Sequence, residues 1–330
     1  MTRLIVQSGI LGLGAYLAIE GEISSGTIIA VSILASRALA PVDQAIASWR
    51  SFVSARQGYG RLRQALSCAA EVTAPFTLPP PQGSLTVAGL FVGPPGAAKP
   101  VIRNISFRLE AGQTLAILGE SAAGKSTLAR ALVGAWLPLG GKVMLDGADI
   151  RQWTQSRLGV HLGYLPQDVQ LFQGTIAENI ARFQPFSDSG AVLAAARAAG
   201  FHKHLLNLPD GYATRIGSGG IELSAGQKQR LGLARALYGD PFLVVLDEPN
   251  SNLDTEGEEA LKAAITGIGA RRGIAVVIAH RTNVVAAVNM LAVMRNGEIA
   301  AFGPRDAILA GPMRAAEGHL PMIGASSGRS

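Results

Sequence analysis

One loop restricts the fold of this 330-residue chain more than any other feature. Residues 119–127 read GESAAGKST, follow the apolar run TLAIL and open the helical pattern STLARALVG. Glycine at 119 and 124 lets the backbone bend so that its N–H groups point at phosphate oxygens, and the N-terminus of the following helix adds positive potential. This strand–loop–helix context predicts a phosphate-binding loop in an α/β fold.

The residue types in this loop suit a nucleoside triphosphate. We expect Lys125 to reach the β- and γ-phosphates and Ser126 to ligate Mg²⁺. An ordinary glycine-rich turn with a stray lysine is the alternative, and the match of both spacing and context disfavours it. The predicted nucleotide contacts in the loop are Gly119, Glu120, Ser121, Ala122, Ala123, Gly124, Lys125, Ser126 and Thr127.

A second motif supplies two carboxylates. Residues 242–249, FLVVLDEP, read as a buried strand that ends in Asp247 and Glu248. Such a pair places one carboxylate at Mg²⁺, here Asp247, and the other beside the attacking water. Alone the pattern is weak, but together with the phosphate-binding loop it indicates nucleotide hydrolysis.

Composition excludes several classes of protein. Hydrophobic residues make up 48% and charged residues 16%, which excludes a disordered or fibrous chain and favours membrane contact. The single cysteine, Cys68, cannot form an intramolecular disulfide or a thiolate metal cluster. The net charge is +6, but aromatic residues are only 5% and no Lys/Arg block occurs, so no nucleic-acid partner is predicted.

The N-terminal region contains two apolar runs, residues 4–19 and 23–39. Arg3 precedes the first run, Glu20 and Glu22 lie between the two, and several arginines follow the second, which fits a membrane hairpin with both ends in the cytoplasm. A signal peptide is disfavoured because a nucleotide-binding unit follows, whereas a soluble helical hairpin remains an alternative because the runs are short. In the membrane interpretation, Arg37 faces a cavity or another helix.

Pattern changes along the chain predict its domain boundaries. Residues 73–84, TAPFTLPPPQGS, are proline-rich and read as a linker. LTVAGLFV and VIRNISFRL then predict an antiparallel pair, and TLAILG, FLVVLD and IAVVIA predict strands of a parallel sheet covered on both faces. We therefore expect a membrane region at 1–72, a nucleotide-binding domain at 85–310 and a disordered tail at 311–330.

Further motifs follow in a fixed order, and with the loop and the acidic strand they resemble the ATP-binding cassette ATPases over about residues 84–310. LSAGQ, residues 223–227, resembles the family signature, and Gln167 in GYLPQD resembles the Q-loop glutamine. SNLD, residues 251–254, resembles the D-loop, and His280 resembles the switch histidine. The resemblance implies an α/β P-loop NTPase fold with an antiparallel β subdomain and an α-helical signature subdomain.

The resemblance also implies a role for each position. Glu248 would polarise the water, His280 would contact the γ-phosphate, and Gln167 would touch Mg²⁺ and sense the membrane domain. Ser224, Gly226 and Gln227 would hold the γ-phosphate of ATP bound to a second copy of the chain. The implied working unit is a head-to-tail homodimer with two equivalent sites for ATP and Mg²⁺.

Some positions depart from the family pattern. Ala122 replaces the middle glycine of the loop and Ala225 replaces a signature glycine, which we expect to be tolerated if φ stays negative. The aromatic residue that stacks on adenine is missing, and its place falls near Pro94. We expect adenine to rest on Pro94, on Val101 or on another residue, and we do not expect strong selectivity for ATP over GTP.

A narrower resemblance is to the type I protein secretion exporters of Gram-negative bacteria. It rests on GYLPQDVQLFQGTIAENIARF, on DEPNSNLD and on GAYLAIEGEISSGTIIAVSILASRALAP. It implies ATP-driven export of a polypeptide across the inner membrane, with a cytoplasmic ATPase domain, a membrane-fusion adaptor protein and an outer-membrane channel.

Two questions remain at this point. Such exporters carry more membrane helices before the cassette than the last two found here. We therefore expect N-terminal truncation, and helices supplied by another polypeptide are the alternative. The alternatives to polypeptide export are a soluble cassette ATPase acting in translation or DNA repair, and an exporter of a small molecule or lipid.

Overall fold

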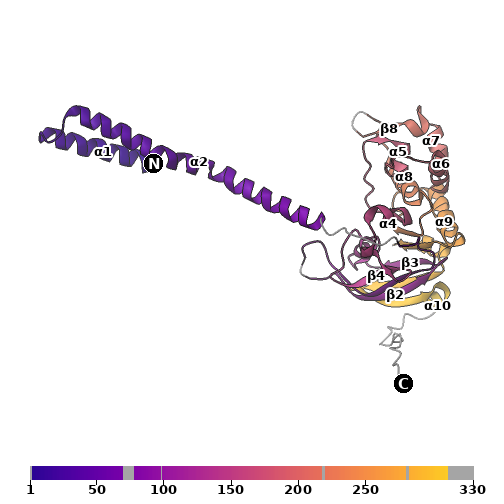
Figure 1. Ribbon diagram of the computed structural model, residues 1–330. Coiled ribbons are helices and arrows are strands. Elements are labelled where there is room, and N and C mark those ends of the chain that lie inside the picture. Colours follow the sequence, from indigo (N-terminus) through magenta and orange to yellow (C-terminus); the bar gives the residue numbers. More distant parts are fainter. Residues whose placement is uncertain (1, 70–77, 98, 218–219, 280–281, 311–330) are drawn as a thin grey trace, which may run out of the picture. The chain divides into compact units, whose positions relative to one another are not determined.

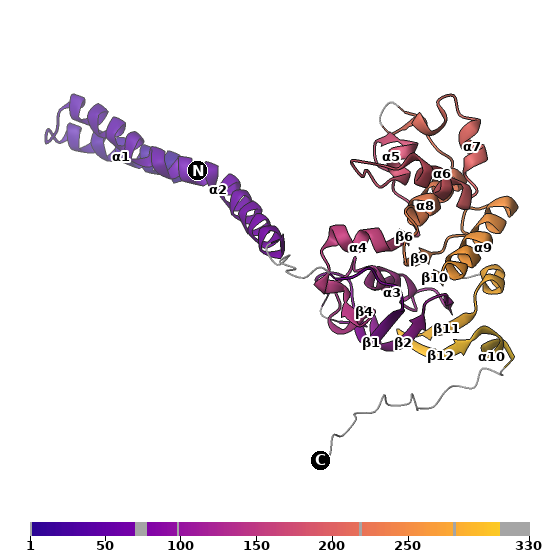
Figure 2. The ribbon, with the colours of Figure 1, turned by 45° about the vertical axis from the view of Figure 1, so that its right-hand side comes forward.

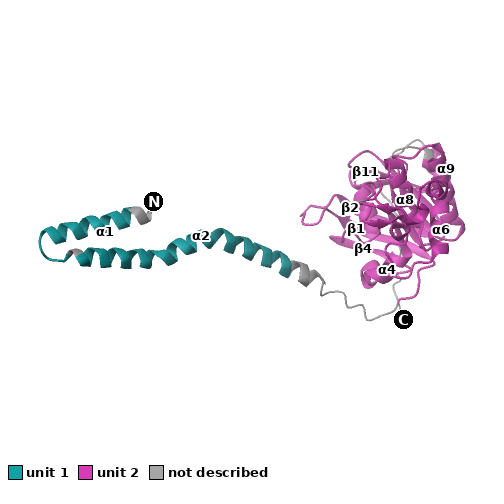
Figure 3. Cartoon of the chain, turned by 90° about the horizontal axis from the view of Figure 1, so that it is seen from above, with its two compact units in different colours: residues 1–73 teal, residues 74–330 magenta. Residues whose placement is uncertain are grey.

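The computed structural model describes residues 2–69, 78–97, 99–217, 220–279 and 282–310. The chain divides into two compact units, Met1–Thr73 and Ala74–Ser330, which Figure 3 shows in different colours. The predictions for His280, for the tail 311–330 and for residues 73–77 of the linker lie outside the described residues.

The first unit is a helical hairpin (Figure 1). Helix α1, Thr2–Ile19, lies antiparallel to the first part of α2, Ser25–Ala69. The Gln7 side chain donates a hydrogen bond to Ser36 Oγ across 2.9 Å. A Cβ at Gly14 would lie 3.2 Å from Ile28 Cγ2, so glycine allows the two helices to approach closely.

The second apolar run and the amphipathic segment after it form one continuous helix. Helix α2 has 45 residues and carries Pro41 inside it. Within the described chain, only Gly26–Arg63 is long and apolar enough to cross a membrane, whereas Ile5–Ile19 is shorter. Of the two predicted spans, the structure thus supports one at full length. Arg37 is exposed in this unit.

The hairpin exposes much of its apolar surface. Ile19 is 86% exposed, Ile5 70% and Ile46 69%, and none of the candidate span is buried inside the chain. Water disfavours so much contiguous apolar surface, which marks a membrane or protein contact.

The second unit begins with a four-stranded antiparallel sheet of order β2-β1-β4-β5. Strand β1, Ser84–Val92, pairs with β2, Ile102–Glu110, which confirms the predicted antiparallel pair. Strands β4, Gly140–Leu145, and β5, Ala148–Asp149, complete the sheet.

A six-stranded sheet of order β12-β11-β3-β10-β9-β6 forms the centre of the unit. The predicted runs become β3 (Thr114–Gly119), β9 (Leu243–Asp247) and β10 (Ile274–Ile278), which are parallel. The other strands are β6 (Leu162–Leu165), β11 (Met290–Arg295) and the antiparallel edge strand β12 (Glu298–Pro304). Because parallel strands share a direction, the carboxyl ends of β3 and β9 lie at the same sheet edge.

Alternate residues of these strands enter two hydrophobic cores, one on each face of the sheet. Leu115 and Ile117 of β3 pack in the core shared with β1 and β2, while Ala116 packs in the core shared with the helices. Period-two alternation of side chains along a strand explains this division. Both faces are therefore apolar, as the continuous hydrophobic runs predict.

Helices cover the sheet and form a subdomain at one end of the unit (Figure 2). The subdomain contains α5 (Ile176–Ile180), α6 (Ser189–Ala198), α7 (His202–Leu206) and α8 (Ala225–Leu237), with the short strands β7 (Gly174–Thr175) and β8 (Arg215–Ile216). The remaining helices are α3 (Lys125–Leu132), α4 (Gln155–His161), α9 (Thr255–Ala270) and α10 (Arg305–Ala310).

Candidate nucleotide-binding and hydrolysis site

The phosphate-binding loop joins β3 to α3 as the sequence predicts. A Cβ at Gly119 would lie 2.4 Å from the carbonyl oxygen of Met294 in β11, so only glycine fits there. Gly124 has a φ of 95°, a left-handed conformation that glycine adopts without strain, and α3 begins at the next residue. Both glycines are thus required by the backbone geometry of the loop.

Lys125 lies inside the loop. Its side chain is 5% exposed, and Nζ donates hydrogen bonds to the carbonyl oxygens of Gly119 at 2.8 Å and Glu120 at 2.7 Å. Burial lowers the pKa of Lys125, while the charges of Glu248 and Asp247 act in the opposite direction. The ammonium group is held at the N-terminus of α3, where an anionic phosphate would replace the weaker carbonyl contacts.

A hydrogen bond joins Asp247, the last residue of β9, to Ser126 in the first turn of α3. Ser126 Oγ donates to Asp247 Oδ1 at 3.1 Å, and Asp247 is fully buried. Its second oxygen, Oδ2, has no hydrogen-bond partner, and burial raises the pKa of the carboxyl group. A hydroxyl and an unsatisfied buried carboxylate oxygen are ligands that Mg²⁺ accepts, so these two residues fit the predicted ion.

Glu248 follows directly at the end of β9. Its φ is 50°, and its N–H donates to the carbonyl of Ile278 in β10 at 3.0 Å. Gln167 Nε2 donates to Glu248 Oε2 at 3.2 Å, although the two residues lie 81 positions apart in sequence. The structure therefore brings Gln167, Glu248 and the Asp247–Ser126 pair together with Lys125.

The predicted signature residues lie at the start of α8. Ser224 caps the helix: its Oγ accepts from the N–H of Gln227 at 3.3 Å, and Gln227 Oε1 accepts from the N–H of Ser224 at 2.9 Å. This reciprocal pair is a capping box. It orients the first turn of α8, which includes Gly226, and Ser224 remains exposed.

The expectation of a negative φ at Ala122 is wrong. Its φ is 63°, so alanine occupies the left-handed region that the glycine of related loops adopts freely. The loop must turn here to direct its carbonyls toward Lys125, and this requirement overrides the local preference of alanine. Ala225, in contrast, is the first residue of α8 and does not have a positive φ. The expectation is therefore confirmed for Ala225.

The two residues predicted to contact adenine lie on the β1–β2 connection. Val101 is 38% exposed, and its Cγ1 would lie 3.5 Å from a Cβ at Gly124, so it flanks the phosphate-binding loop. Pro94 lies in an exposed turn, where its carbonyl accepts from the N–H of Ala97 at 2.9 Å. The adenine contact stays a prediction for both residues.

Sequence reasoning missed two buried polar residues of α8. Gln229, 2% exposed, donates to the carbonyl of Pro249 at 3.1 Å and to that of Glu248 at 3.5 Å. Arg230, 3% exposed, donates to Gly200 O at 2.7 Å and pairs with the Asp254 carboxylate. The available signal was the run of four polar residues, 227–230, between Gly226 and the apolar positions that follow.

Asp254, in the predicted D-loop, also caps α9. Its Oδ1 accepts from the N–H of Gly257 at 2.8 Å, and this bond holds the pKa of the carboxyl below its usual value. One carboxylate therefore joins the start of α9 to the signature helix through Arg230.

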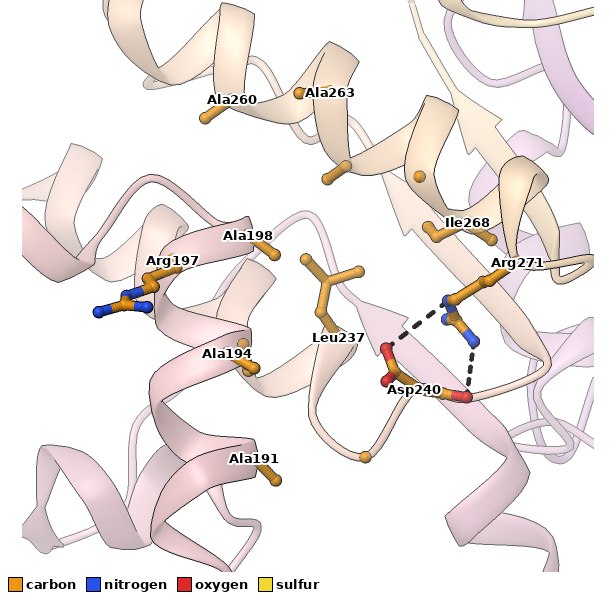
Figure 4. A pocket seen from close by; sticks show the side chains of 14 residues that line it. Ala191, Ala194, Arg197, Ala198, Leu237, Asp240, Ala260, Ala263, Ile268 and Arg271 are labelled. Carbon is orange, nitrogen blue, oxygen red and sulfur yellow. Dashed lines mark hydrogen bonds and ion pairs between the residues drawn. The ribbon is translucent and has the colours of Figure 1, made fainter.

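A cavity of about 450 Å³ lies elsewhere, between α6 and α9 (Figure 4). Alanines such as Ala191, Ala194 and Ala263 line it, and Arg271 closes one end by donating to the carbonyl of Asp240 at 2.6 Å. None of the predicted site residues lines this cavity.

The geometry defines a class of protein. A parallel sheet with a glycine-rich loop after β3, a lysine enclosed by that loop and two carboxylates at the end of β9 is the architecture of P-loop nucleotide-binding proteins.

Comparisons with known proteins agree. Residues 102–251 match the ABC transporter family. The type I secretion system ATP-binding protein PrsD of Rhizobium meliloti is 53% identical over 312 residues, 94% of this chain and 54% of that protein. The cyclolysin secretion/processing ATP-binding protein CyaB of Bordetella pertussis is 34% identical over 93% of this chain and 43% of that protein. The structure of a bacterial Atm1-family ABC exporter with ATP bound is 29% identical, with a TM-score of 0.64, over 93% of this chain and 54% of that one.

This chain therefore carries an ABC transporter domain over residues 102–251. It resembles the ATP-binding proteins of type I secretion systems, and it spans about half the length of the curated relatives it matches.

Proposed function

We propose that this chain is part of an exporter that uses ATP to move a polypeptide across the bacterial inner membrane in a type I secretion system. The observation that carries this proposal is the alignment with PrsD. Its 312 residues exceed the length of the unit Ala74–Ser330, so the similarity extends into the hairpin as well as the cassette. The exposed apolar surface of the hairpin supports a membrane location.

The residues of the site have distinct roles in this proposal. Lys125 and the N-terminus of α3 bind the β- and γ-phosphates of ATP. Ser126 and Asp247 hold Mg²⁺, with Gln167 as a further contact, and the ion when bound would neutralise phosphate charge. Glu248 orients the attacking water and accepts its proton. The hydrogen bond from Gln167 restrains the Glu248 carboxylate, whose charge acts on Lys125.

His280 would contact the γ-phosphate. In the sequence it comes two residues after β10, the strand between β3 and β9, and its own placement lies outside the described residues.

The proposed working unit is a homodimer of two head-to-tail cassettes. The start of α8, with Ser224, Gly226 and Gln227, would contact the γ-phosphate of ATP bound to the second copy. An anion is then held between two helix N-termini, each of which contributes positive potential. ATP would close the pair, and hydrolysis would allow it to open.

The proposed organisation follows the predicted boundaries. Residues 1–72 belong to the membrane region, 73–84 link it to the cassette, and 85–310 form the cytoplasmic nucleotide-binding domain. A membrane-fusion adaptor protein, an outer-membrane channel and the secreted polypeptide are the proposed partners.

The test of polypeptide export uses the native cell. We expect disruption of the gene to remove at least one polypeptide from the culture medium and to retain it inside the cell. The wild-type gene should restore secretion, while the matched Glu248→Gln gene, produced at the same level, should not. An unchanged set of secreted polypeptides would refute this function and favour a small-molecule or lipid cargo.

A soluble cassette ATPase is the competing class. Removing residues 1–66 should release the protein from membranes if the hairpin anchors it. Continued sedimentation of the shortened protein with lipid vesicles would contradict the anchor, whereas a full-length protein found only in the soluble fraction would support the competing class.

A further inference from the structure

One face of the signature helix α8 lies along the segment that carries Glu248. A Cβ at Gly226 would lie 2.9 Å from the carbonyl oxygen of Asn252, so the first turn of α8 packs directly on that backbone. One turn later, Gln229 Nε2 donates to the Pro249 carbonyl at 3.1 Å. Positions 226, 229 and 230 are spaced three and four apart, and they therefore share a helix face.

Glu248 has a backbone conformation that its surroundings must hold. Its φ is 50°, in the left-handed region, where a residue with a side chain stays only when neighbouring groups fix it. On its N-terminal side, its N–H is bonded to Ile278 of β10 at 3.0 Å. On its C-terminal side, the amide of Gln229 bonds the carbonyls of Pro249 and Glu248.

Gln229 is well suited to this task. It is 2% exposed, so water does not compete for its amide donors. The Glu248 carbonyl also accepts from the N–H of Ser251 at 3.3 Å, so the turn after β9 has its own support. Gln229 adds the connection from this turn to a different element, the signature helix.

We propose that Gln229 is a positioning residue for hydrolysis: it fixes the backbone that carries the Glu248 carboxylate and couples it to the helix that meets the nucleotide of the second copy. The coupling half of this inference rests on the proposed head-to-tail dimer. A phosphate bound at the start of α8 then restrains Glu248 of the same chain, so the occupancy of one site influences catalysis at the other.

The expected loss concerns the rate rather than ATP binding. Without the amide, the Pro249 carbonyl loses its partner and Glu248 loses one of its restraints. Misplacement of a catalytic group by about 1 Å can reduce a rate by roughly 100-fold, so a partial release should reduce kcat by about tenfold. The hydrogen bonds of Gln229 go to the carbonyls of Glu248 and Pro249 rather than to Lys125 or the phosphate-binding loop, so the KM for ATP should stay within about twofold.

The first experiment compares Gln229→Met and Gln229→Glu in the full 330-residue chain, purified in detergent. Methionine keeps the shape without a donor, and a carboxylate would repel the two carbonyls. The matched control is Leu233→Met, also buried on α8 at 1% exposure and without a polar contact to replace. The readouts are kcat, KM for ATP and the melting temperature.

We expect kcat to be highest in the wild type, lower in Gln229→Met and lowest in Gln229→Glu. The melting temperature of Gln229→Met should be close to that of the Leu233→Met control. A Gln229→Met protein with kcat within about twofold of wild type would overturn the positioning role. The positioning role would also be overturned if kcat of the Gln229 variants decreased only in proportion to their melting temperatures and the Leu233→Met control lost as much activity.

A second measurement addresses coupling between the two copies. ATP hydrolysis by the wild type should depend cooperatively on ATP, and Gln229→Met should reduce the Hill coefficient toward one. Equal cooperativity in both proteins would overturn the coupling while leaving the proposed dimer intact. If instead Glu248→Gln protein fails to dimerise with ATP and Mg²⁺, the proposed dimer fails and the coupling fails with it.

Discussion

Asp247 offers a test in which stability and activity change in opposite directions. In the absence of Mg²⁺ its carboxylate is fully buried, with Ser126 bonded to Oδ1 and no partner at Oδ2. A buried polar group without a partner costs about 1–3 kcal/mol. Asp247→Asn removes the charge and keeps an oxygen for Ser126, so we expect a gain of about 1–2 kcal/mol, partly offset by the new amide.

The assay is thermal unfolding of the full chain, with and without Mg²⁺ and ATP. In Mg²⁺-free buffer the variant should melt about 2–8 °C above wild type, at about 2–4 °C per kcal/mol for a domain of this size. With ligand at about 100 times its Kd, wild type gains about 2.7 kcal/mol and the order should reverse. The variant should also lose Mg²⁺-dependent hydrolysis. A variant less stable than wild type without Mg²⁺, or one that still hydrolyses ATP, would refute the reasoning.

The same group predicts a pH dependence. Burial raises the pKa of Asp247 above its ordinary value of 3.8, so the folded state holds this proton more tightly than the unfolded state. The stability from protonated Asp247 is fully present below 3.8 and is lost as pH rises through the elevated folded pKa. Without Mg²⁺, the stability difference between variant and wild type should therefore be largest near neutral pH and should shrink in acid.

Three further substitutions test the site. Glu248→Gln should abolish turnover but keep ATP bound, which trapped radiolabelled ATP would show; full turnover would exclude Glu248 as the base. Lys125→Ala should weaken ATP binding at least tenfold because the phosphates lose a charged partner, and unchanged affinity by calorimetry would contradict this. Ala122→Gly should relieve the left-handed strain and stabilise the protein by about 1 kcal/mol, as chemical denaturation would measure; a destabilised variant would show that φ is not the limiting factor.

The central sheet could be predicted because its strands are buried on both faces. The runs TLAILG, FLVVLD and IAVVIA contain almost no polar residue, and each became a parallel strand feeding two cores. Local spacing also placed Lys125 at the start of α3 and Glu248 after β9. Their proximity follows from topology, since parallel strands end at one edge.

Other features depend on tertiary contacts that a single sequence does not display. The positive φ of Ala122 arises because the loop must direct its carbonyls at Lys125. The role of Gln229 depends on how α8 lies against the turn after β9, which periodicity alone does not fix. In the hairpin, the sequence marked the second apolar run only over residues 23–39, whereas the backbone continues as one 45-residue helix through Pro41.

The electrostatics of α8 connect these observations. At its C-terminal end, Arg182 donates to the carbonyls of Arg235 at 3.0 Å, Ala236 at 3.3 Å and Tyr238 at 3.4 Å. Burial lowers the pKa of Arg182 to about 10, so the guanidinium remains charged at neutral pH. A cation therefore complements the negative end of the helix dipole inside the chain. At the opposite end, the first N–H groups lack intrahelical acceptors, and the capping box at Ser224 satisfies only part of them. An external anion is favoured at that end, which is where the proposed dimer places the γ-phosphate.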